Sequence, residues 1–530
     1  MSSSQSSIAE KMYTTCTNPA TGEVIGQSEI TPLSEVAGII EKARSAQLRW
    51  SGMPLRQRII GLRRVQQYLV EHKDEIAEVI AQDNGKVRVD AMATEVLPAA
   101  MAIAYYSRKA RRFLRPQGCG TGNLFLANKR SQIIRQPFGV IAIISPWNYP
   151  FAIPFSEVVM ALLAGNAVVL KVASETQVVG RKLDDCFRVA ELPDGVFQYI
   201  NIPGKDVGDA LFAAGIDKLF FTGSVAVGKY LMSRAGQTLT PVVLELGGND
   251  PMIVCEDADL VRAVGGAVWA GFSNCGQSCG GVERIYVAEK VYDDFLGLLK
   301  NRLETLRIGY DTDFRVDMGA MTTERQVVTV QRHIEDALNQ GAEIYAQAKI
   351  PETLNLKNFL PATVLVNVNH NMLVMKDETF GPVVGVMKFR AVEEAVTLAN
   401  DSYLGLTASV WSRNRRQAIE IGKRLKAGVI TINDHLMSHG LAETPWGGFK
   451  QSGIGRTHGK IGFDEMTQPQ VVVDDKFAFT RNNLWWPPYS EKLYHGLSGL
   501  LDLLYAKKIS RRLRGFGRIL KILPRMFSAD

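Results

Sequence analysis

Hydrophobic and polar positions follow two different patterns along the chain. From about residue 34 to residue 110, apolar residues recur at helical intervals, with an interruption at Asp83-Asn84-Gly85. From residue 140 onward, short apolar runs such as Val140–Ile144 and Ala167–Lys171 alternate with helical stretches. Short runs without a polar interruption are typical of strands that are buried on both faces. The pattern therefore predicts an α/β fold built on a doubly wound parallel sheet.

Two successive α/β stretches are expected. The first has strands at 140–144, 167–171, 195–200 and 218–221 and a helix at 154–164; the second extends from about 251 to 446, with strands at 285–287, 363–366, 383–389 and 429–433. Outside them, 17–22 reads as a turn between short strands, and 130–137 alternates like an exposed strand of a projecting hairpin. Ligands of a doubly wound sheet bind beyond the carboxyl ends of its strands, where Asn148, Lys171 and Gly223 lie.

The composition indicates a globular protein of at least two domains, because 530 residues are too many for one simple core. No apolar run of about 18 residues is long enough to cross a membrane. Residues 1–11 are Ser-rich and lack the apolar core of a secretory signal, so we expect a loose tail. The six cysteines give no disulfide framework, and no histidine near Cys275 and Cys279 completes a zinc site. We expect a cytoplasmic protein without a metal.

A thiol and a carboxylate are the strongest candidates for chemistry. Cys279 follows Gly276-Gln277-Ser278, and Glu245 precedes Leu246-Gly247-Gly248. A nucleophilic thiol with a carboxylate that later activates water suits covalent catalysis. Either residue alone has a simpler explanation, since a lone cysteine is usually a small buried hydrophobe and a lone glutamate a solvated charge.

Three strand ends carry further candidates, each ambiguous by itself. Asn148, in a rigid loop between two prolines, can donate to an oxyanion but is also a common turn residue. The strand, turn and helix around Gly223 and Ser224 can present N–H groups to a phosphate, although the spacing differs from G-x-G-x-x-G. Lys171 can meet a ribose or phosphate, or merely extend its ammonium to solvent.

Together these residues resemble the NAD(P)-dependent aldehyde dehydrogenase superfamily. The resemblance covers about residues 17–473, and seven motifs occur in the family's order. They are Pro146-Trp147-Asn148-Tyr149-Pro150-Phe151, the segment from Ala164 to Lys171, the segment from Phe221 to Gly228, Leu244-Glu245-Leu246-Gly247-Gly248, Gly276-Gln277-Ser278-Cys279, Glu378-Thr379-Phe380-Gly381-Pro382 and the segment from Pro445 to Gly453.

The resemblance implies a mechanism with a role for each residue. Cys279 attacks the aldehyde carbon, and the amide of Asn148 with the N–H of Cys279 holds the oxyanion of the thiohemiacetal. After oxidation to a thioester, Glu245 activates the water that releases the acid; relatives that transfer the acyl group to coenzyme A lack this carboxylate. The remaining matches contact the dinucleotide, namely Trp147, Lys171, Gly223, Ser224, Glu378 and Phe380.

The resemblance also implies a domain plan. Residues 1–115 and 138–247 form the dinucleotide-binding domain, and 248–446 form the catalytic domain. Residues 116–137 and 447–475 form an oligomerisation arm and the return to the cofactor domain, and 476–530 form a basic C-terminal extension. Members usually pair through a projecting hairpin and an edge strand, so we expect a homodimer or tetramer that uses 116–137 and 467–473.

The choice between NAD and NADP depends on the residues after Lys171. NAD-preferring members commonly have a glutamate three positions later, whose carboxylate binds the ribose 2′-hydroxyl and repels a 2′-phosphate. Here Ser174 occupies that position and Glu175 follows it. A small neutral serine at this position resembles members that accept NADP, so NADP is slightly favoured over NAD. If the loop shifts by one residue, Glu175 binds the 2′-hydroxyl of NAD instead.

The positive charge belongs to the extension. The chain has a net charge of +7, and residues 476–530 contain eleven Lys and Arg against three Asp and Glu. Apolar residues of this segment recur at helical spacing among the cations. They are Leu497, Leu500, Leu501, Leu504, Ile509, Leu513, Phe516, Leu520 and Leu523. With Trp485-Trp486 ahead of them, they suit an interfacial helix on an anionic membrane, where each cation contributes on the order of 1 kcal/mol.

We therefore expect residues 485–527 to bind the inner face of a membrane, in preference to packing on the enzyme or a neighbouring subunit. Nucleic acid is not expected, since the chain shows a basic segment but no recognition motif. A similar tail is found in superfamily members that act on long apolar aldehydes, including carotenoid ones, so we expect an apolar substrate. Two alternatives stay open: a semialdehyde dehydrogenase of the succinate type with a cationic group in its substrate pocket, and a non-catalytic binding protein on the same fold.

Overall fold

The computed structural model describes residues 11–354 and 357–528 and divides the chain into two compact units. The first unit comprises Met1–Leu114 and Gln136–Gln468, and the second comprises Arg115–Arg135 and Pro469–Asp530. The loose tail expected at residues 1–11 lies outside the described residues, apart from Lys11. No described helix is long and apolar enough to cross a membrane.

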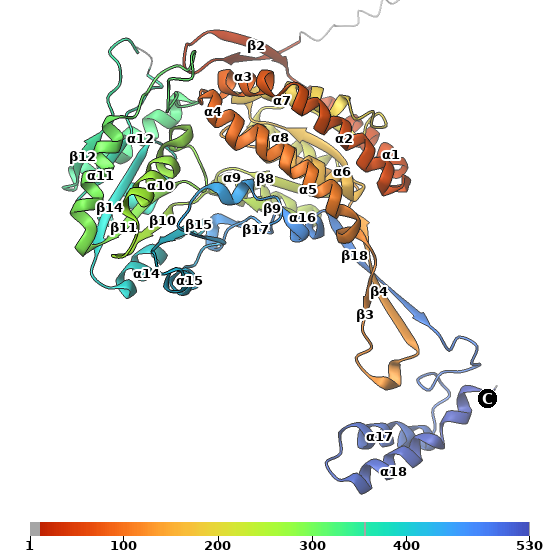
Figure 1. Ribbon diagram of the computed structural model, residues 1–530. Helices are drawn as coiled ribbons and strands as arrows, with labels where there is room; N and C mark the ends of the chain where they lie inside the picture. Colours follow the sequence, from red (N-terminus) through yellow and green to blue (C-terminus); the bar gives the residue numbers. More distant parts are fainter. Residues whose placement is uncertain (1–10, 355–356, 529–530) are drawn as a thin grey trace, which may run out of the picture. The chain divides into compact units, whose positions relative to one another are not determined.

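A six-stranded sheet forms the first half of unit 1 (Figure 1). In spatial order its strands are β17 (Gly453–Ile454), β9 (Val242–Glu245), β8 (Lys218–Thr222), β5 (Val140–Ile144), β6 (Ala167–Lys171) and β7 (Phe197–Tyr199). All pairs are parallel except that of β17 with β9. The chain winds outward from β5 in both directions, so the order reverses between β5 and β8, which is where doubly wound sheets bind their ligands.

Helices cover both faces of this sheet because successive strand residues point in opposite directions. Val140, Ala142 and Ile144 belong to one apolar cluster, and Ile141 and Ile143 belong to another. The first cluster includes α1 (Val36–Gly52), α8 (Gly204–Ala213) and α9 (Val225–Thr238). The second includes α2 (Leu55–Glu71), α3 (Lys73–Asn84), α5 (Leu97–Leu114), α6 (Ala152–Ala164), α7 (Gln177–Arg188) and α16 (Gly459–Glu465). The short helix α4 (Arg88–Ala91) and a π-helical turn at Met92–Val96 precede α5.

A seven-stranded sheet forms the other half of unit 1. Its order is β12 (Glu343–Gln347), β13 (Thr363–Val366), β14 (Val383–Phe389), β11 (Val282–Ala288), β10 (Asp250–Val254), β15 (Thr407–Trp411) and β16 (Val429–Ile432). Its helices are α10 (Leu260–Phe272), α11 (Tyr292–Glu304), α12 (Glu324–Asn339), α13 (Leu373–Lys376), α14 (Val392–Asn400) and α15 (Arg415–Gly422). Only β12 is antiparallel to its neighbour. A separate hairpin, β1 (Tyr13–Thr17) with β2 (Val24–Glu29), follows the N-terminus.

The second unit combines a small sheet with a helical hairpin. The sheet has the order β18 (Thr467–Asp475), β4 (Lys129–Pro137) and β3 (Gln117–Cys119), so β18 lies at an edge. Helices α17 (Glu491–Tyr505) and α18 (Ile509–Leu520) pack against each other. Their backbones approach closely at Gly499 and Gly515: a Cβ at Gly515 would lie 2.4 Å from the carbonyl oxygen of Gly499.

The fold class expected from the sequence is confirmed. The strands expected at 140–144, 167–171, 363–366 and 383–389 occur with those bounds, whereas the one expected at 195–200 is limited to Phe197–Tyr199 and the one expected at 285–287 extends over Val282–Ala288. The polar residues Glu283 and Arg284 account for the second difference, since backbone pairing rather than side-chain polarity decides where a strand begins. The domain boundaries inferred from the resemblance stay a prediction.

Candidate active site

Loops from both sheets of unit 1 meet around a cavity of about 230 Å³. Strand register explains the meeting on the six-stranded side, because Ile144 pairs with Phe221 and Thr222 pairs with Glu245. Eight residues expected at the site line this one cavity: Trp147, Asn148, Gly223, Ser224, Glu245, Cys279, Glu378 and Phe380. These residues are far apart in the sequence, and the fold brings them to one cavity.

Cys279 follows a strained turn. Asn274 and Cys275 have left-handed backbone angles, with φ of 51° and 55°, and Gly276 continues at 67°. The buried carboxylate of Asp90 accepts hydrogen bonds from the N–H of Asn274 and the hydroxyl of Ser273, both at 3.0 Å. Because non-glycine residues in this region cost about 1–3 kcal/mol each, such bonds are needed to hold the turn. Burial raises the pKa of the Cys279 thiol, so the resting group is protonated.

Asn148 is held from three directions. Its side-chain amide donates to the backbone carbonyl oxygen of Gln277 at 3.0 Å. The backbone carbonyl oxygen of Asn148 accepts from Lys86 Nζ at 2.9 Å and from Asn274 Nδ2 at 3.0 Å. Lys86 forms a fully buried ion pair of 2.6 Å with Glu95. The other oxygen of Glu95 accepts the N–H of Phe151 at 2.7 Å, at the start of α6. One hydrogen of the Asn148 amide therefore stays free for a ligand.

Glu245 differs from these fixed groups. It is buried at the end of β9, and neither of its carboxylate oxygens has a hydrogen-bond partner among the described residues. Gly447 makes room for it, since a Cβ there would lie 2.8 Å from Glu245 Oε1. Burial raises the pKa of Glu245 well above its usual range, and the nearby carboxyl of Glu157 raises it further. A carboxyl group of this kind can take up a proton readily.

The opposite wall of the cavity contains Glu378 and Phe380. Glu378 accepts the N–H of Gly248 at 3.0 Å, and a Cβ at Gly247 would lie only 2.2 Å from its carboxylate, so a glycine is required there. The rings of Trp147 and Phe380 meet edge to face, with centroids 5.4 Å apart. Glu283, buried in β11, accepts the N–H groups of Thr379 and Phe380 at 3.0 and 2.7 Å and fixes this loop.

Lys171, Ser174 and Glu175 lie outside this cavity, after the end of β6. The carbonyl of Lys171 accepts the N–H of Ser145, which joins this strand end to the Asn148 loop. Burial lowers the pKa of Lys171 to about 8, and the carboxylate of Glu175 opposes that shift. A Cβ at Gly204, the first residue of α8, would lie 3.9 Å from Lys171 Nζ. Ser174 and Glu175 are both half-buried.

These features fit a dinucleotide. The turn after β8 leads into α9, where Ser224 caps the helix by accepting the N–H of Val227. A Cβ at Gly223 would lie 2.5 Å from the ring of Phe221, so only glycine allows this turn. The hydroxyl of Thr222 is buried, and none of the described residues forms a hydrogen bond with it. Free N–H groups at a helix start, a strand-end lysine and an aromatic pair are the elements that bind phosphate, ribose and a flat ring.

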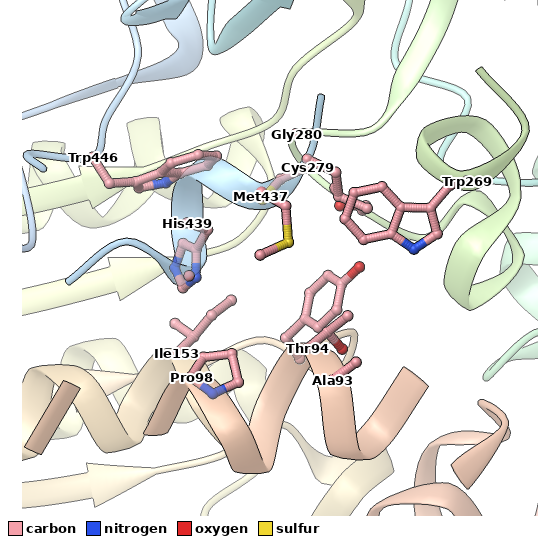
Figure 2. A pocket seen from close by; sticks show the side chains of 14 residues that line it. Ala93, Thr94, Pro98, Ile153, Trp269, Cys279, Gly280, Met437, His439 and Trp446 are labelled. Carbon is pink, nitrogen blue, oxygen red and sulfur yellow. The ribbon is translucent and has the colours of Figure 1, made fainter. Parts of the chain in front are cut away.

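A second pocket opens on Cys279 and is apolar. Figure 2 shows Trp269, Met437 and Trp446 around the same space, with Ala93, Thr94 and Pro98 beside them. Ala93 and Thr94 come from the π-helical turn at Met92–Val96, a feature that often occurs at functional sites. We call this pocket the funnel. Among the described residues that line it, none is a lysine, arginine, aspartate or glutamate. Burial lowers the pKa of its one imidazole, His439, to about 4, so this group is neutral.

Comparison with known proteins assigns the family. The model of the aldehyde dehydrogenase family matches residues 6–472. The chain belongs to the aldehyde dehydrogenase family.

Two relatives and one solved structure illustrate the similarity. A 4,4'-diapolycopene aldehyde oxidase from a Methylomonas species is 38% identical, over 92% of this chain and 91% of its own. A Mycolicibacterium smegmatis protein, provisionally named an NADP(+) succinate-semialdehyde dehydrogenase, is 35% identical over 86% and 87%. The structure of a Staphylococcus aureus betaine aldehyde dehydrogenase in complex with NAD+ is 29% identical and has a TM-score of 0.84, over 90% and 96%.

The protein is thus an NAD(P)-dependent oxidoreductase that acts on aldehydes. This assignment excludes the alternative of a non-catalytic binding protein on the same fold. The sequence did not predict some of the residues at this aldehyde dehydrogenase site. Arg325, Gln326 and Thr329 line the cofactor cavity from the start of α12, and Glu157 and His458 lie near Glu245. Except for His458, which precedes Gly459, none of them stands beside a glycine or at the end of an apolar run, so the fold alone places them at the site.

The buried pair of Lys86 and Glu95 predicts a stability effect that is not additive. Lys86→Met leaves an unpaired buried carboxylate, and Glu95→Gln leaves an unpaired buried ammonium, so each is expected to lower the free energy of unfolding by about 3–5 kcal/mol. The double variant leaves neither charge and is expected to lose clearly less than the sum of the two. Urea denaturation followed by tryptophan fluorescence measures this.

A matched control is the exposed pair of Lys460 and Asp464 on α16. Lys460→Met should change stability by less than about 1 kcal/mol, because water screens that pair. Additive effects of the Lys86 and Glu95 substitutions would contradict the view that these charges support each other.

Proposed function

We propose that this enzyme oxidises long or apolar aldehydes to carboxylic acids through a covalent intermediate on Cys279. The observation that supports the substrate class is the uncharged funnel in front of the thiol. A neutral, mostly apolar channel favours an alkyl or polyene chain, since each methylene removed from water contributes about 0.8 kcal/mol. The side chain of Met437 lines the funnel and is partly exposed, so the apolar character extends to where the funnel meets solvent.

The alternative is a semialdehyde dehydrogenase, as in the relative from M. smegmatis. A small semialdehyde of that type carries a negatively charged carboxylate in addition to its aldehyde group. Burying this charge without a cationic partner costs several kcal/mol. The described funnel residues supply no such cation, and neutral His439 does not replace one. The apolar substrate is therefore favoured.

The Methylomonas relative adds independent support. Its name gives a carotenoid aldehyde as its substrate, and its match covers 92% of this chain. Such coverage must extend past Val472, where the family model ends. The similarity thus includes part of the region that distinguishes this chain from relatives with a common family length.

The first chemical step falls to Cys279 and Asn148. Because the thiol is protonated at rest, its attack on the aldehyde carbon needs a base, and Glu245 lines the same cavity. The free hydrogen of the Asn148 amide and the N–H of Cys279 can stabilise the oxyanion of the thiohemiacetal. A bound nicotinamide would accept the hydride that the thiohemiacetal carbon loses as the thioester forms. Trp147, Gly223, Ser224, Glu378 and Phe380 are the residues that would hold the cofactor there.

Glu245 completes the cycle as the base for hydrolysis. Its carboxylate takes a proton from water as the oxygen attacks the thioester carbonyl, and the sulfur of Cys279 leaves as the acid forms. This role distinguishes a hydrolytic enzyme from one that passes the acyl group to coenzyme A. We propose a slight preference for NADP over NAD. The small side chain of Ser174 suits a 2′-phosphate near Lys171, whereas the carboxylate of Glu175 would repel that phosphate.

The substrate proposal predicts how rates depend on chain length. Initial formation of NADH or NADPH, measured with linear aldehydes, should give kcat/KM values that rise with each added methylene, by about fourfold at most. Succinic semialdehyde should be a poor substrate, and Met437→Arg should improve it because a cation then faces its carboxylate. Met437→Leu is the matched control, and Cys279→Ala should abolish all activity. A higher kcat/KM for succinic semialdehyde than for hexanal would overturn the proposal.

We propose, further, that β18 mediates a homodimer or tetramer. It is an edge strand, and Val471, Val472 and Val473 on it are exposed. Exposed apolar edge strands are normally covered by another chain.

Charging this strand should therefore weaken assembly. The double variant Val471→Asp and Val473→Asp is expected to have a lower molar mass by light scattering, because two buried charges oppose pairing. Val24→Asp, at an exposed valine of β2, is the control and should leave the mass unchanged. A wild-type mass equal to that of one chain would contradict the proposal.

We also propose that the helical hairpin of unit 2 binds an anionic membrane surface. The inner face of α18 uses Gly515 and Ile519, which are buried against α17. The predicted apolar stripe lies on its outer side, where Ile509 and Leu513 are 74% and 67% exposed. Arginines at 511, 512, 514 and 518 are exposed beside it. Packing within unit 2 therefore leaves the stripe uncovered, next to the cations that an anionic surface attracts.

Vesicle sedimentation tests this surface. Full-length protein should sediment with vesicles that contain phosphatidylserine and much less with neutral vesicles, and added salt should release it. Leu513→Asp should lower binding about tenfold or more, because a charge replaces an apolar contact. Ser510→Asp adds the same charge to α18 outside the stripe and should cost at most about fivefold. Equal loss for the two variants, or no binding at all, would favour a packing role for the tail.

A further inference from the structure

A small inner cavity adjoins Glu245. Its volume is about 10 Å³, the space that one water molecule occupies. Its lining includes Glu157, Thr222, Glu245, Cys279, His439 and His458. Glu157 comes from α6, the helix that begins after the Asn148 loop, and it is buried.

Four polar atoms around this cavity have no hydrogen-bond partner in the part of the chain that the structure describes. They are both carboxylate oxygens of Glu245, the hydroxyl of Thr222 and Nδ1 of His458. Buried polar groups are almost always hydrogen-bonded, either to protein or to ordered water. A polar cavity of this size with several convergent groups is the kind of site where one water bridges them.

The charge on Glu245 makes these contacts important. To act as a base, Glu245 must be a carboxylate, and a buried carboxylate without any donor is strongly disfavoured. The cavity offers three kinds of donor: the Thr222 hydroxyl, the His458 imidazole and the carboxyl group of Glu157 when it is protonated. Only the last of these changes its protonation near neutral pH.

Glu157 is mostly neutral below about pH 8. Burial raises its pKa to about 8, and among the described residues no cation pairs with it and no group donates a hydrogen bond to it. The groups that face it are Glu245, Cys279, His439, His458 and, from α5, Tyr106. Glu245 is faced in addition by Arg456 and Glu465. His439 and His458 both have lowered pKa values and stay neutral.

We propose that Glu157 is a positioning residue for Glu245. As a neutral carboxylic acid it donates a hydrogen bond, through a water in the inner cavity, to the carboxylate of Glu245. It thereby supports the charged form that activates the hydrolytic water. This inference rests on the proposed role of Glu245 in thioester hydrolysis.

The pH dependence follows from the pair. When Glu157 loses its proton, the donor is lost and a second negative charge faces Glu245 across the cavity. Like charges that line one small cavity favour a shared proton, which then resides partly on Glu245 and blocks its role as a base. Hydrolysis should therefore be supported below about pH 8 and lose this support above it.

An ester assay tests the step without any cofactor. With p-nitrophenyl hexanoate, the Cys279 sulfur displaces p-nitrophenol in a burst and forms a thioester, and water then releases hexanoic acid and restores the thiol. The burst reports acylation, and the steady-state rate reports hydrolysis. Both are followed at the isosbestic wavelength of the phenol, and the same variants are then measured with hexanal and NAD(P).

Two substitutions separate a donor from a structural residue. Glu157→Leu removes the donor and should keep the burst but slow the steady state about tenfold or more. Glu157→Gln keeps a donor and cannot ionise, so its steady-state rate divided by that of the wild type should be constant below pH 7 and rise several-fold above pH 8. Ser156→Ala, at the preceding position of α6 and outside this cavity, should match the wild type at every pH.

Glu245→Gln is the reference for the proposed function and should slow the steady state by about a hundredfold or more while keeping the burst. If it does not, the role of Glu245 fails. If it does, while Glu157→Leu has the wild-type rate or the Glu157→Gln ratio does not change with pH, the inference about Glu157 is overturned.

Discussion

Three buried carboxylates that accept hydrogen bonds from backbone N–H groups hold the loops of the active site. Asp90 binds the turn before Cys279, Glu95 binds the start of α6 behind Asn148, and Glu283 binds the loop of Phe380. Each loop leaves regular structure inside the protein, where unpaired N–H groups are costly. A carboxylate accepts several such bonds at once, and a charged acceptor makes them stronger. The positions of the reactive side chains therefore depend on groups that take no part in the chemistry.

Glu245 and Glu157 contrast with these three. The holding carboxylates have donors that partly offset the effect of burial, although burial still raises the pKa of both Asp90 and Glu283: Asp90 receives an N–H and a hydroxyl, and Glu283 receives two N–H groups. Glu245 has no donor among the described residues. Its carboxylate is thus destabilised relative to the protonated form, which is the property that a base needs to take a proton from water near neutral pH. Buried carboxyl groups with donors thus hold loops in place, whereas the buried carboxyl group of Glu245, without donors, has the raised pKa that suits a base.

The sequence predicted the site better than its surroundings. Val140–Ile144 and Ala167–Lys171 are continuous apolar runs, so their strands could be placed, and the residues that follow them were expected at strand ends. Cys279, Glu245 and Asn148 stand in motifs of glycine, proline and aromatic residues, and the fold brings them to one cavity, although their roles stay predictions. Glu157 lies in the middle of a buried helix, where its neighbours Ser156 and Val158 give no sign of a function. Its proposed role depends on the cavity that it shares with Glu245, 88 positions away in the sequence, and no local pattern shows this proximity.

The tail shows the same limit in another form. The spacing of Ile509, Leu513 and Phe516 predicted a helical apolar stripe, and a helix occurs there. The pattern could not tell whether the stripe is buried, because that depends on where the chain turns back. Gly499 and Gly515 allow the two helix backbones to touch, and this contact directs Ile519 inward and leaves the stripe outward. Two glycines, which add nothing to hydrophobicity, thus decide that packing within unit 2 leaves the apolar face and its arginines exposed.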